Sequence, residues 1–218
     1  MNKSKRNFLL SIVILFVSAF SINAKELPNV LLIGDSISIH YTKPTQELLK
    51  GKANVLHHPG NAMWSTMLLK KLDSHLAAKK WDVIHFNVGN WDVCTSRGAK
   101  DQKDDPEVPA RGKVRVPEEV YKKNLEEIIK KLKATGAKII WASTTHIPNK
   151  KGVMNERVPK YNKIAEELMK ANGIVVNDLY TSIEPKLKEL QRQGNCHFNE
   201  AGSKFLAEKV VEHIKKQL

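Results

Sequence analysis

The sequence predicts one α/β domain, a three-layer α/β/α sandwich with a five-stranded parallel sheet. Short continuous apolar runs recur along the chain, beginning with Val30-Leu31-Leu32-Ile33, and such runs are typical of strands buried on both faces. Longer segments with apolar residues at helical spacing separate these runs. Strict alternation of strand and helix favours a parallel sheet covered by helices on both sides.

The N-terminal segment is expected to lie outside this domain. Three basic residues precede an apolar run over 8–20, and Ala24 offers a small residue for cleavage. This order is that of a secretory signal, and the apolar core is short for a membrane span. We therefore expect a signal peptide over 1–24, a mature domain over 25–218, and a secreted or periplasmic protein without stable membrane insertion. A retained anchor is the alternative.

Each expected strand is a short apolar run followed by turn or polar residues. Gly34 follows the strand expected over Asn29–Ile33, and Gly89 follows the strand expected to begin at Trp81. The five expected strands, in chain order, cover 29–33, 53–57, 81–88, 138–144 and 174–177.

The expected helices lie between these strands and after the last one. Pro44 suits the first turn of the first helix, and Gly136 is typical of the end of the third. The six expected helices cover 42–50, 63–79, 118–135, 156–171, 182–193 and 199–216.

In one stretch the apolar residues follow neither helical nor strand spacing. Residues 92–117 are polar and contain Pro106, Pro109 and Pro117. Loops of this length in compact domains are usually functional or disordered.

The composition limits the possible partners. The chain has 36 Lys and Arg against 23 Asp and Glu, and its net charge of +13 falls to +10 without the three basic residues of the signal. A polyanion-binding protein is therefore one function class to consider. However, the lysines alternate with glutamates on helices, and no nucleic-acid motif is visible. We expect no nucleic-acid partner. Zinc spacings and glycine-rich phosphate fingerprints are also absent from the sequence, so no metal or other cofactor is expected.

Ser36 follows the first strand directly, in Gly34-Asp35-Ser36. Ligands of open α/β sheets bind at the carboxyl ends of the strands. A serine there serves as a nucleophile if a base reaches it. Alternatively, Asp35 and Ser36 only cap the helix that follows.

Further polar segments are expected at the same edge. Gly60 follows the second strand, Gly89-Asn90-Trp91-Asp92 follows the third, and His197 precedes the last helix. Histidine is the usual base for a serine near neutral pH. The N–H groups of Ser36 and Gly60 can hold an oxyanion, and the candidates for a third donor are the amides of Asn61, Asn87 and Asn90.

At these residues the chain resembles the SGNH hydrolases, also called the GDSL esterases and lipases. Gly34-Asp35-Ser36-Ile37 is similar to the first block of that family, Gly60 to the glycine of the second, and His197 with 198–202 to the last. The resemblance spans most of the mature domain. It implies the flavodoxin-like fold of the family, with Ser36 as nucleophile and His197 as base.

Two positions depart from the family pattern. The third block is usually Gly-x-Asn-Asp, and Trp91 stands where the asparagine would be. The indole N–H of Trp91 and the amide of Asn90 are equal candidates for the oxyanion. The last block is usually Asp-x-x-His, and Gly194 stands in place of the aspartate.

The partner that orients His197 is therefore left open by the sequence. A backbone carbonyl near Gly194 would leave a Ser-His dyad. A carboxylate from elsewhere, Asp92 or Asp178, is the other possibility.

The two cysteines, Cys94 and Cys196, are expected to form a disulfide, because an exported protein lies where disulfides persist. Two buried thiols are the alternative. Four residues are further candidates for the pocket: Asp35, Asn61, Asp92 and His146. Trp64 and Trp91 either stack on a sugar ring or belong to the core.

The leading functional hypothesis is a secreted serine esterase that hydrolyses acyl esters, with acetyl groups on carbohydrate as the preferred substrate implied by the family. A lysophospholipase or thioesterase is the first alternative. A non-catalytic glycan-binding protein of the same fold is the second, suggested by the two departures. The sequence does not specify the acyl group, the polymer or the oligomeric state.

Overall fold

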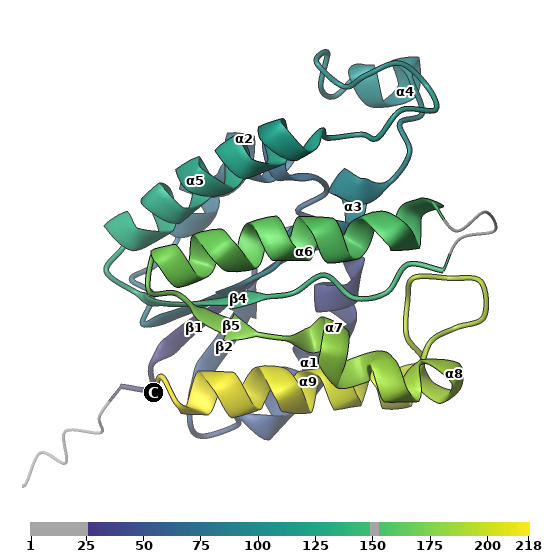
Figure 1. The fold of residues 1–218 in the computed structure, drawn as a ribbon. Helices are drawn as coiled ribbons and strands as arrows, with labels where there is room; N and C mark the ends of the chain where they lie inside the picture. Colours follow the sequence, from purple (N-terminus) through teal and green to yellow (C-terminus); the bar gives the residue numbers. More distant parts are fainter. Residues whose placement is uncertain (1–25, 149–152) are drawn as a thin grey trace, which may run out of the picture.

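A computed structural model describes residues 26–148 and 153–218 (Figure 1). The predicted signal peptide lies outside the described residues. The predicted parallel sheet is confirmed, with five strands in the order β2-β1-β3-β4-β5. The strands are β1 (Asn29–Ile33), β2 (Asn54–His57), β3 (Val83–Phe86), β4 (Lys138–Ala142) and β5 (Val175–Asn177).

Helices cover both faces of the sheet, which confirms the three-layer sandwich (Figure 1). Helices α1 (Ser36–Leu48) and α9 (Glu200–Lys215) pack together on one face. Helices α2 (Ser65–Leu76), α5 (Glu118–Ala134) and α6 (Val153–Ala171) cover the other.

Successive residues of the strands alternate between two hydrophobic clusters. In β1, Val30 and Leu32 belong to the cluster with α1 and α9, while Leu31 and Ile33 belong to the other. Both sides of β1 are therefore buried, as its continuous apolar run requires.

Helix α1 begins six residues earlier than the sequence predicts. Asp35 is its N-cap, with a carboxylate oxygen that accepts the N–H of Ile37 at 2.8 Å. Pro44, expected in the first turn, lies inside the helix. The cap reading of Asp35 is therefore correct, and the cap places Ser36 at the first helical position.

The helix predicted over 182–193 is wrong. This stretch instead contains α7 (Leu179–Ile183), the 3₁₀ helix η1 (Glu184–Lys186) and α8 (Leu187–Leu190). Pro185 lies in η1, where its missing N–H prevents one continuous α-helix.

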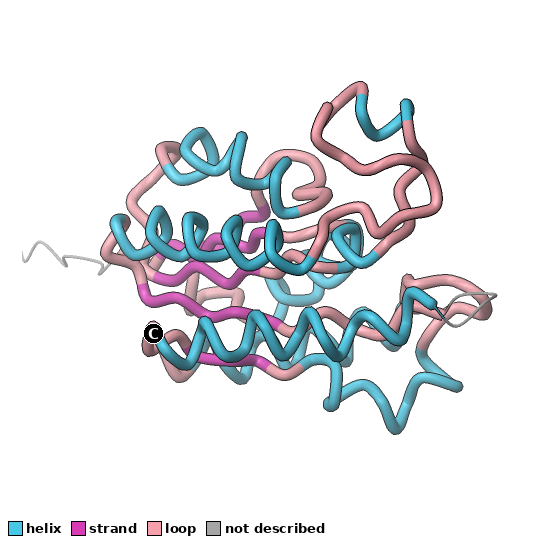
Figure 2. Tube along the Cα trace, turned by 45° about the horizontal axis from the view of Figure 1, so that its top comes forward, coloured by secondary structure: helices cyan, strands magenta, loops and turns pink. Residues whose placement is uncertain are grey.

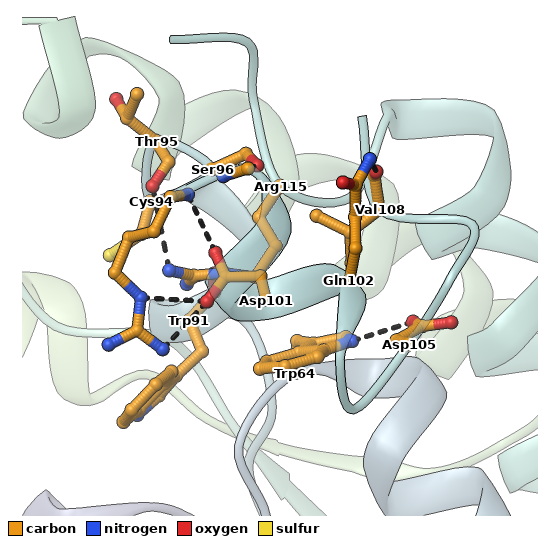
Figure 3. A network of polar contacts seen from close by, with 12 residues as sticks. Trp64, Trp91, Cys94, Thr95, Ser96, Asp101, Gln102, Asp105, Val108 and Arg115 are labelled. Carbon is orange, nitrogen blue, oxygen red and sulfur yellow. Dashed lines mark hydrogen bonds and ion pairs between the residues drawn. The ribbon is translucent and has the colours of Figure 1, made fainter. Parts of the chain in front are cut away.

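The segment 92–117 is an ordered layer of short helices and ion pairs (Figure 3). It includes α4 (Ala99–Gln102), and α3 (Asn90–Val93) overlaps its start. The buried carboxylate of Asp101 binds both Arg97, at 2.6 Å, and Arg115, at 3.0 Å. These charge-assisted contacts stabilise the segment, which lacks the regular spacing of apolar residues that would pack it against the core.

The loops that carry the candidate site residues lie at the carboxyl ends of the strands. Figure 2 shows the longer loops extending from this end of the sheet. The turn before α1, the loop after β2 and the loop before α9 all lie here. Within the part of the chain that the structure describes, no helix is both long and apolar enough to span a membrane.

His85 is a fully buried titratable group in β3. Its Nε2 lies 3.1 Å from the side-chain nitrogen of Asn177, so the imidazole accepts this hydrogen bond and is neutral. Burial, and then the charge of His213, lower the pKa of His85 to about 3.

We expect His85 to cause acid destabilisation. In unfolded chains histidine titrates near pH 6.5, so the stability contributed by neutral His85 is full above that pH and is lost as the pH falls toward 3. His85→Leu should flatten the acid dependence of the free energy of unfolding, measured by chemical denaturation at several pH values. At pH 7 it should cost about 1–3 kcal/mol, because the amide of Asn177 loses its acceptor.

The control is Ser74→Ala on the exposed side of α2, which removes no titratable group and should keep the acid dependence of the wild type. An unchanged acid dependence in His85→Leu would show that other groups cause the acid destabilisation.

Candidate active site

The structure brings Ser36 and His197 together. Ser36 is the first residue of α1, and His197 lies in the loop before α9. The Ser36 Oγ lies 2.7 Å from Nε2 of His197. Two segments 161 residues apart in sequence thus place a hydroxyl and an imidazole at hydrogen-bond distance.

The other ring nitrogen of His197 contacts Asn195. The side-chain oxygen of Asn195 lies 2.6 Å from Nδ1 and accepts the backbone N–H of His197 at 3.0 Å. Because the backbone N–H can only donate, it fixes which end of the amide faces the ring. Nδ1 therefore carries the proton, and Nε2 accepts the hydroxyl of Ser36.

Asn195 replaces the candidates that the sequence offered for orienting His197. Asp92 instead accepts the N–H of Ser65, at the start of α2, at 2.9 Å. Asp178 accepts the hydroxyl of Ser143 at 2.8 Å and caps α7. The sequence held one signal, since an asparagine side chain readily bonds the backbone N–H two residues later.

His40 is a second residue that the sequence analysis missed. Its ring meets that of His197 edge-on, with centroids 5.2 Å apart. The signal was its spacing, because positions 36 and 40 share one face of α1. Burial lowers the pKa of His197, and the charges of His40 and Arg192 lower it further. The imidazole therefore stays neutral, and able to accept a proton, at pH values below those at which a histidine is usually neutral.

Removal of the His40 charge is expected to raise the pKa of His197. In His40→Gln, the acid limb of kcat/KM for an aryl acetate should therefore move to higher pH, with the plateau retained. A pH–rate profile measures this. The control is His213→Gln on α9, where the ring bonds only the Lys209 carbonyl. An acid limb that stays in place would mean that His40 exerts no electrostatic effect on the base.

Gly34 is needed for space rather than for its backbone angle. Its φ is not in the left-handed region, but an added Cβ would lie 2.7 Å from Oγ of Ser38. The first turn of α1 therefore packs directly on the residue that follows β1. This contact fixes the direction in which α1, with Ser36, leaves the sheet.

Asp35 is 3% exposed and lies beside Asn90 at the start of α1. Burial raises the pKa of Asp35, while the N–H of Ile37 and the amide of Asn90 partly offset this effect. Asp35 therefore lines a small cavity beside the start of α1, together with Asn87 and Asn90.

The other predicted amide donors have structural partners. The side-chain oxygen of Asn61 accepts the N–H of Met63 at 2.8 Å. Asn87 donates to the carbonyl of Ala142 at 2.7 Å and so joins β3 to β4. Gly60 is exposed at the tip of the loop after β2, with φ of +75°.

The side chains of Trp91 and Asn90 contact different groups. The guanidinium of Arg115 lies 5.3 Å from the rings of both Trp64 and Trp91, and it donates to the Trp91 carbonyl at 2.6 Å (Figure 3). Trp64 is fully buried, so it belongs to the core and not to a sugar platform. Asn90, in contrast, lies beside Asp35 and Cys196, the sequence neighbours of Ser36 and His197.

The predicted disulfide is not present in the structure, because Cys94 and Cys196 are both free thiols. The sulfur of Cys94 lies 3.1 Å from the carbonyl oxygen of Asn90, and that of Cys196 lies 3.8 Å from Nδ1 of His197. Each thiol therefore has a polar neighbour of its own.

Two of the predicted pocket residues are placed away from Ser36. Asp92, in α3, is fully buried beside the start of α2, and burial raises its pKa to about 6. His146 stacks on Tyr180, with ring centroids 3.8 Å apart, and its Nε2 lies 3.6 Å from Glu184. Both residues therefore support neighbouring helices.

Several solved structures share this fold. A lipase/acylhydrolase from Enterococcus faecalis matches with a TM-score of 0.72 and 19% identity over 88% of this chain and 97% of its own. The acetyl xylan esterase AlAXEase matches with a TM-score of 0.67 and 20% identity over 85% and 99%. Axe2, an acetylxylan esterase from Geobacillus stearothermophilus, matches with a TM-score of 0.66 and 17% identity over 86% and 94%. No curated protein sequence matches this chain.

These similarities define the fold class as that of the SGNH hydrolases. The model of the GDSL-like lipase/acylhydrolase family matches residues 32–205, which is most of the chain. The protein belongs to this family, as its sequence motifs predict. The family and the structural neighbours are esterases and hydrolases, which supports hydrolase activity.

Proposed function

We propose that this protein is a serine esterase that removes acyl groups, with acetyl as the preferred group, from carbohydrate. The observation that carries the proposal is the contact of 2.7 Å between Oγ of Ser36 and Nε2 of His197. Asn195 holds the imidazole in the tautomer that leaves Nε2 free to accept a proton. This is the geometry of an activated nucleophile.

The reaction has two stages. Oγ of Ser36 forms a bond to the acyl carbon as its proton passes to Nε2 of His197, and the carbonyl becomes an oxyanion. The intermediate then collapses, the bond to the leaving alcohol breaks, and Nε2 delivers the proton to that alcohol. Water, deprotonated by the same nitrogen, then attacks the acyl carbon. The bond between that carbon and Oγ breaks, the acid leaves, and Nε2 returns its proton to Ser36.

Three donors are proposed for the oxyanion. The backbone N–H of Ser36 is unpaired by position, since it belongs to the first turn of α1. Gly60 supplies a second N–H from the loop after β2. We assign the third to the side chain of Asn90, because it lies beside Asp35 and Cys196, whereas the indole of Trp91 packs on arginines.

The preference for carbohydrate is supported by the neighbours and by the segment 92–117. Two structural neighbours are acetylxylan esterases. Arg115 is 4% exposed and bound to Asp101, so it is not available for an anionic polymer. The exposed basic residues of this segment are Arg97, Lys100, Lys103, Arg111 and Lys113.

A substrate panel tests the proposal. Released acetate is measured from acetylated xylo-oligosaccharides, and turnover of an aryl acetate and of a lysophospholipid is measured in parallel. We expect acetate release from the oligosaccharides. Faster turnover of the lysophospholipid would assign the lipid alternative, and binding of oligosaccharide without turnover of any ester would assign the non-catalytic one.

We also propose that the protein acts outside the cytoplasm after removal of residues 1–24. The charge and hydropathy order of that segment supports this. N-terminal sequencing of the exported protein should begin at Lys25, and a retained Met1 would argue against cleavage.

A further inference from the structure

The loop that carries Gly60 is tied to the turn before Ser36 through a single carbonyl oxygen. The oxygen of Gly34 accepts the N–H of Ala62 at 3.0 Å and lies 2.9 Å from Nε2 of His58. Because a carbonyl can only accept, Nε2 of His58 carries the proton. Two hydrogen bonds, one from each side of Gly60, therefore meet two residues before Ser36.

A second connection runs from His57 to the first turn of α1. Its Nδ1 lies 2.7 Å from the His58 carbonyl and so donates to it. Its Nε2 lies 2.7 Å from Oγ of Ser38, which also lies 2.7 Å from the Asp35 carbonyl. Burial, and then the charge of His58, lower the pKa of His57 to about 4. The ring is therefore neutral, and the one hydroxyl proton of Ser38 is shared between Nε2 and the Asp35 carbonyl.

The two histidines belong to a column of three imidazoles below the loop. The rings of His57 and His58 stack with centroids 4.5 Å apart, and His58 meets His75 of α2 at 4.6 Å. His58 is 2% exposed and His75 is 8% exposed. The contacts with His57 of β2 and His75 of α2 leave the ring of His58 little freedom to move.

The tip of the loop has no comparable support. Gly60 is exposed, and an added Cβ there would meet nothing within 4 Å. Its φ of +75° lies in the region that favours glycine. The direction of the Gly60 N–H is therefore set by the hydrogen bonds at the base of the loop.

We propose that His58, supported by His57, is a positioning residue that aims the N–H of Gly60 at the oxyanion formed on Ser36. The inference rests on the proposed function, in which that N–H stabilises the oxyanion. An oxyanion donor lowers the barrier only when it is aimed at the developing charge. His58 thus acts through Gly60 and does not itself touch substrate.

Two variants of His58 and one matched control test the proposal. His58→Leu removes the donor to Gly34, while His58→Gln keeps an N–H at similar reach. His213→Leu on α9 also removes a ring that bonds a backbone carbonyl, that of Lys209. We expect kcat for an aryl acetate to fall about 10-fold or more in His58→Leu with KM nearly unchanged, because loss of one oxyanion donor costs about 10²–10³-fold.

The same experiment requires His58→Gln to recover most of kcat and His213→Leu to retain it. A folded His58→Leu protein with kcat close to that of the wild type would overturn the proposal. So would an equal loss in both His58 variants, because that loss would not depend on the N–H.

Amide hydrogen exchange separates this inference from the proposed function. In His58→Leu the amide of Ala62 should exchange faster, and in His213→Leu it should not. Unchanged protection of the Ala62 amide in His58→Leu would overturn the inference, whether or not the protein hydrolyses esters. A wild-type protein without Ser36-dependent hydrolysis would instead reject the proposed function, and the exchange rates would still decide whether His58 holds the loop.

Discussion

Replacing Ser36 with alanine is expected to lower kcat/KM for an aryl acetate by a factor of about 10⁴ or more. In the proposed mechanism this hydroxyl forms the covalent bond, and among the described residues no other hydroxyl contacts His197. His197→Ala should cause a similar loss. The double variant should lose little more, because the two side chains act as one unit.

The control is Ser74→Ala on the exposed side of α2, where the hydroxyl bonds only the Lys71 carbonyl. It should retain the wild-type rate. Mass spectrometry after treatment with an alkyl phosphonate adds a chemical test, since the label should lie on Ser36 and be absent from Ser36→Ala. Full activity in both Ser36→Ala and His197→Ala would refute the assignment of the nucleophile.

Replacing Asn195 with alanine is expected to lower kcat by about 10²-fold or more, because Nδ1 of His197 loses the acceptor that selects its tautomer. Asn195→Asp should act differently. A carboxylate favours the charged imidazolium, so the pKa of His197 rises and the acid limb of the pH–rate profile moves to higher pH. Because the imidazolium also forms in the transition state, kcat on the plateau should be at least that of the wild type.

Asn54→Ala is the matched control, since this exposed amide bonds the Leu27 carbonyl far from the nucleophile. It should leave kcat and the pH profile unchanged. A rate for Asn195→Ala close to the wild-type value would mean that the ring of His197 is oriented by other contacts.

The architecture was predictable because its signals are local. Each buried strand is a short apolar run, and the clusters on the two faces of β1 follow from alternation of its side chains. The start of α1 was not predicted, because Pro44 resembles a helix start and Asp35 had to be recognised as the cap. The helix predicted over 182–193 failed at Pro185, because the missing N–H of that proline interrupts the helical pattern.

The candidate site was predictable only in part. Ser36 and His197 follow from their motifs, and the parallel sheet brings their segments to one edge. The role of Asn195 depends on a side-chain rotamer that the sequence does not specify. The contacts of His40 and His75 were not predicted, because packing of α1 and α2 against the loops places their rings beside His197 and His58.

The packing of α9 against α1 has a consequence for biosynthesis. The sheet and the loop with Gly60 come from earlier parts of the chain, whereas His197 directly precedes the last helix. A nascent chain that has not yet released α9 therefore has the serine but lacks its base. In the proposed enzyme, the contact between Ser36 and His197 therefore forms only when α9 has docked on α1.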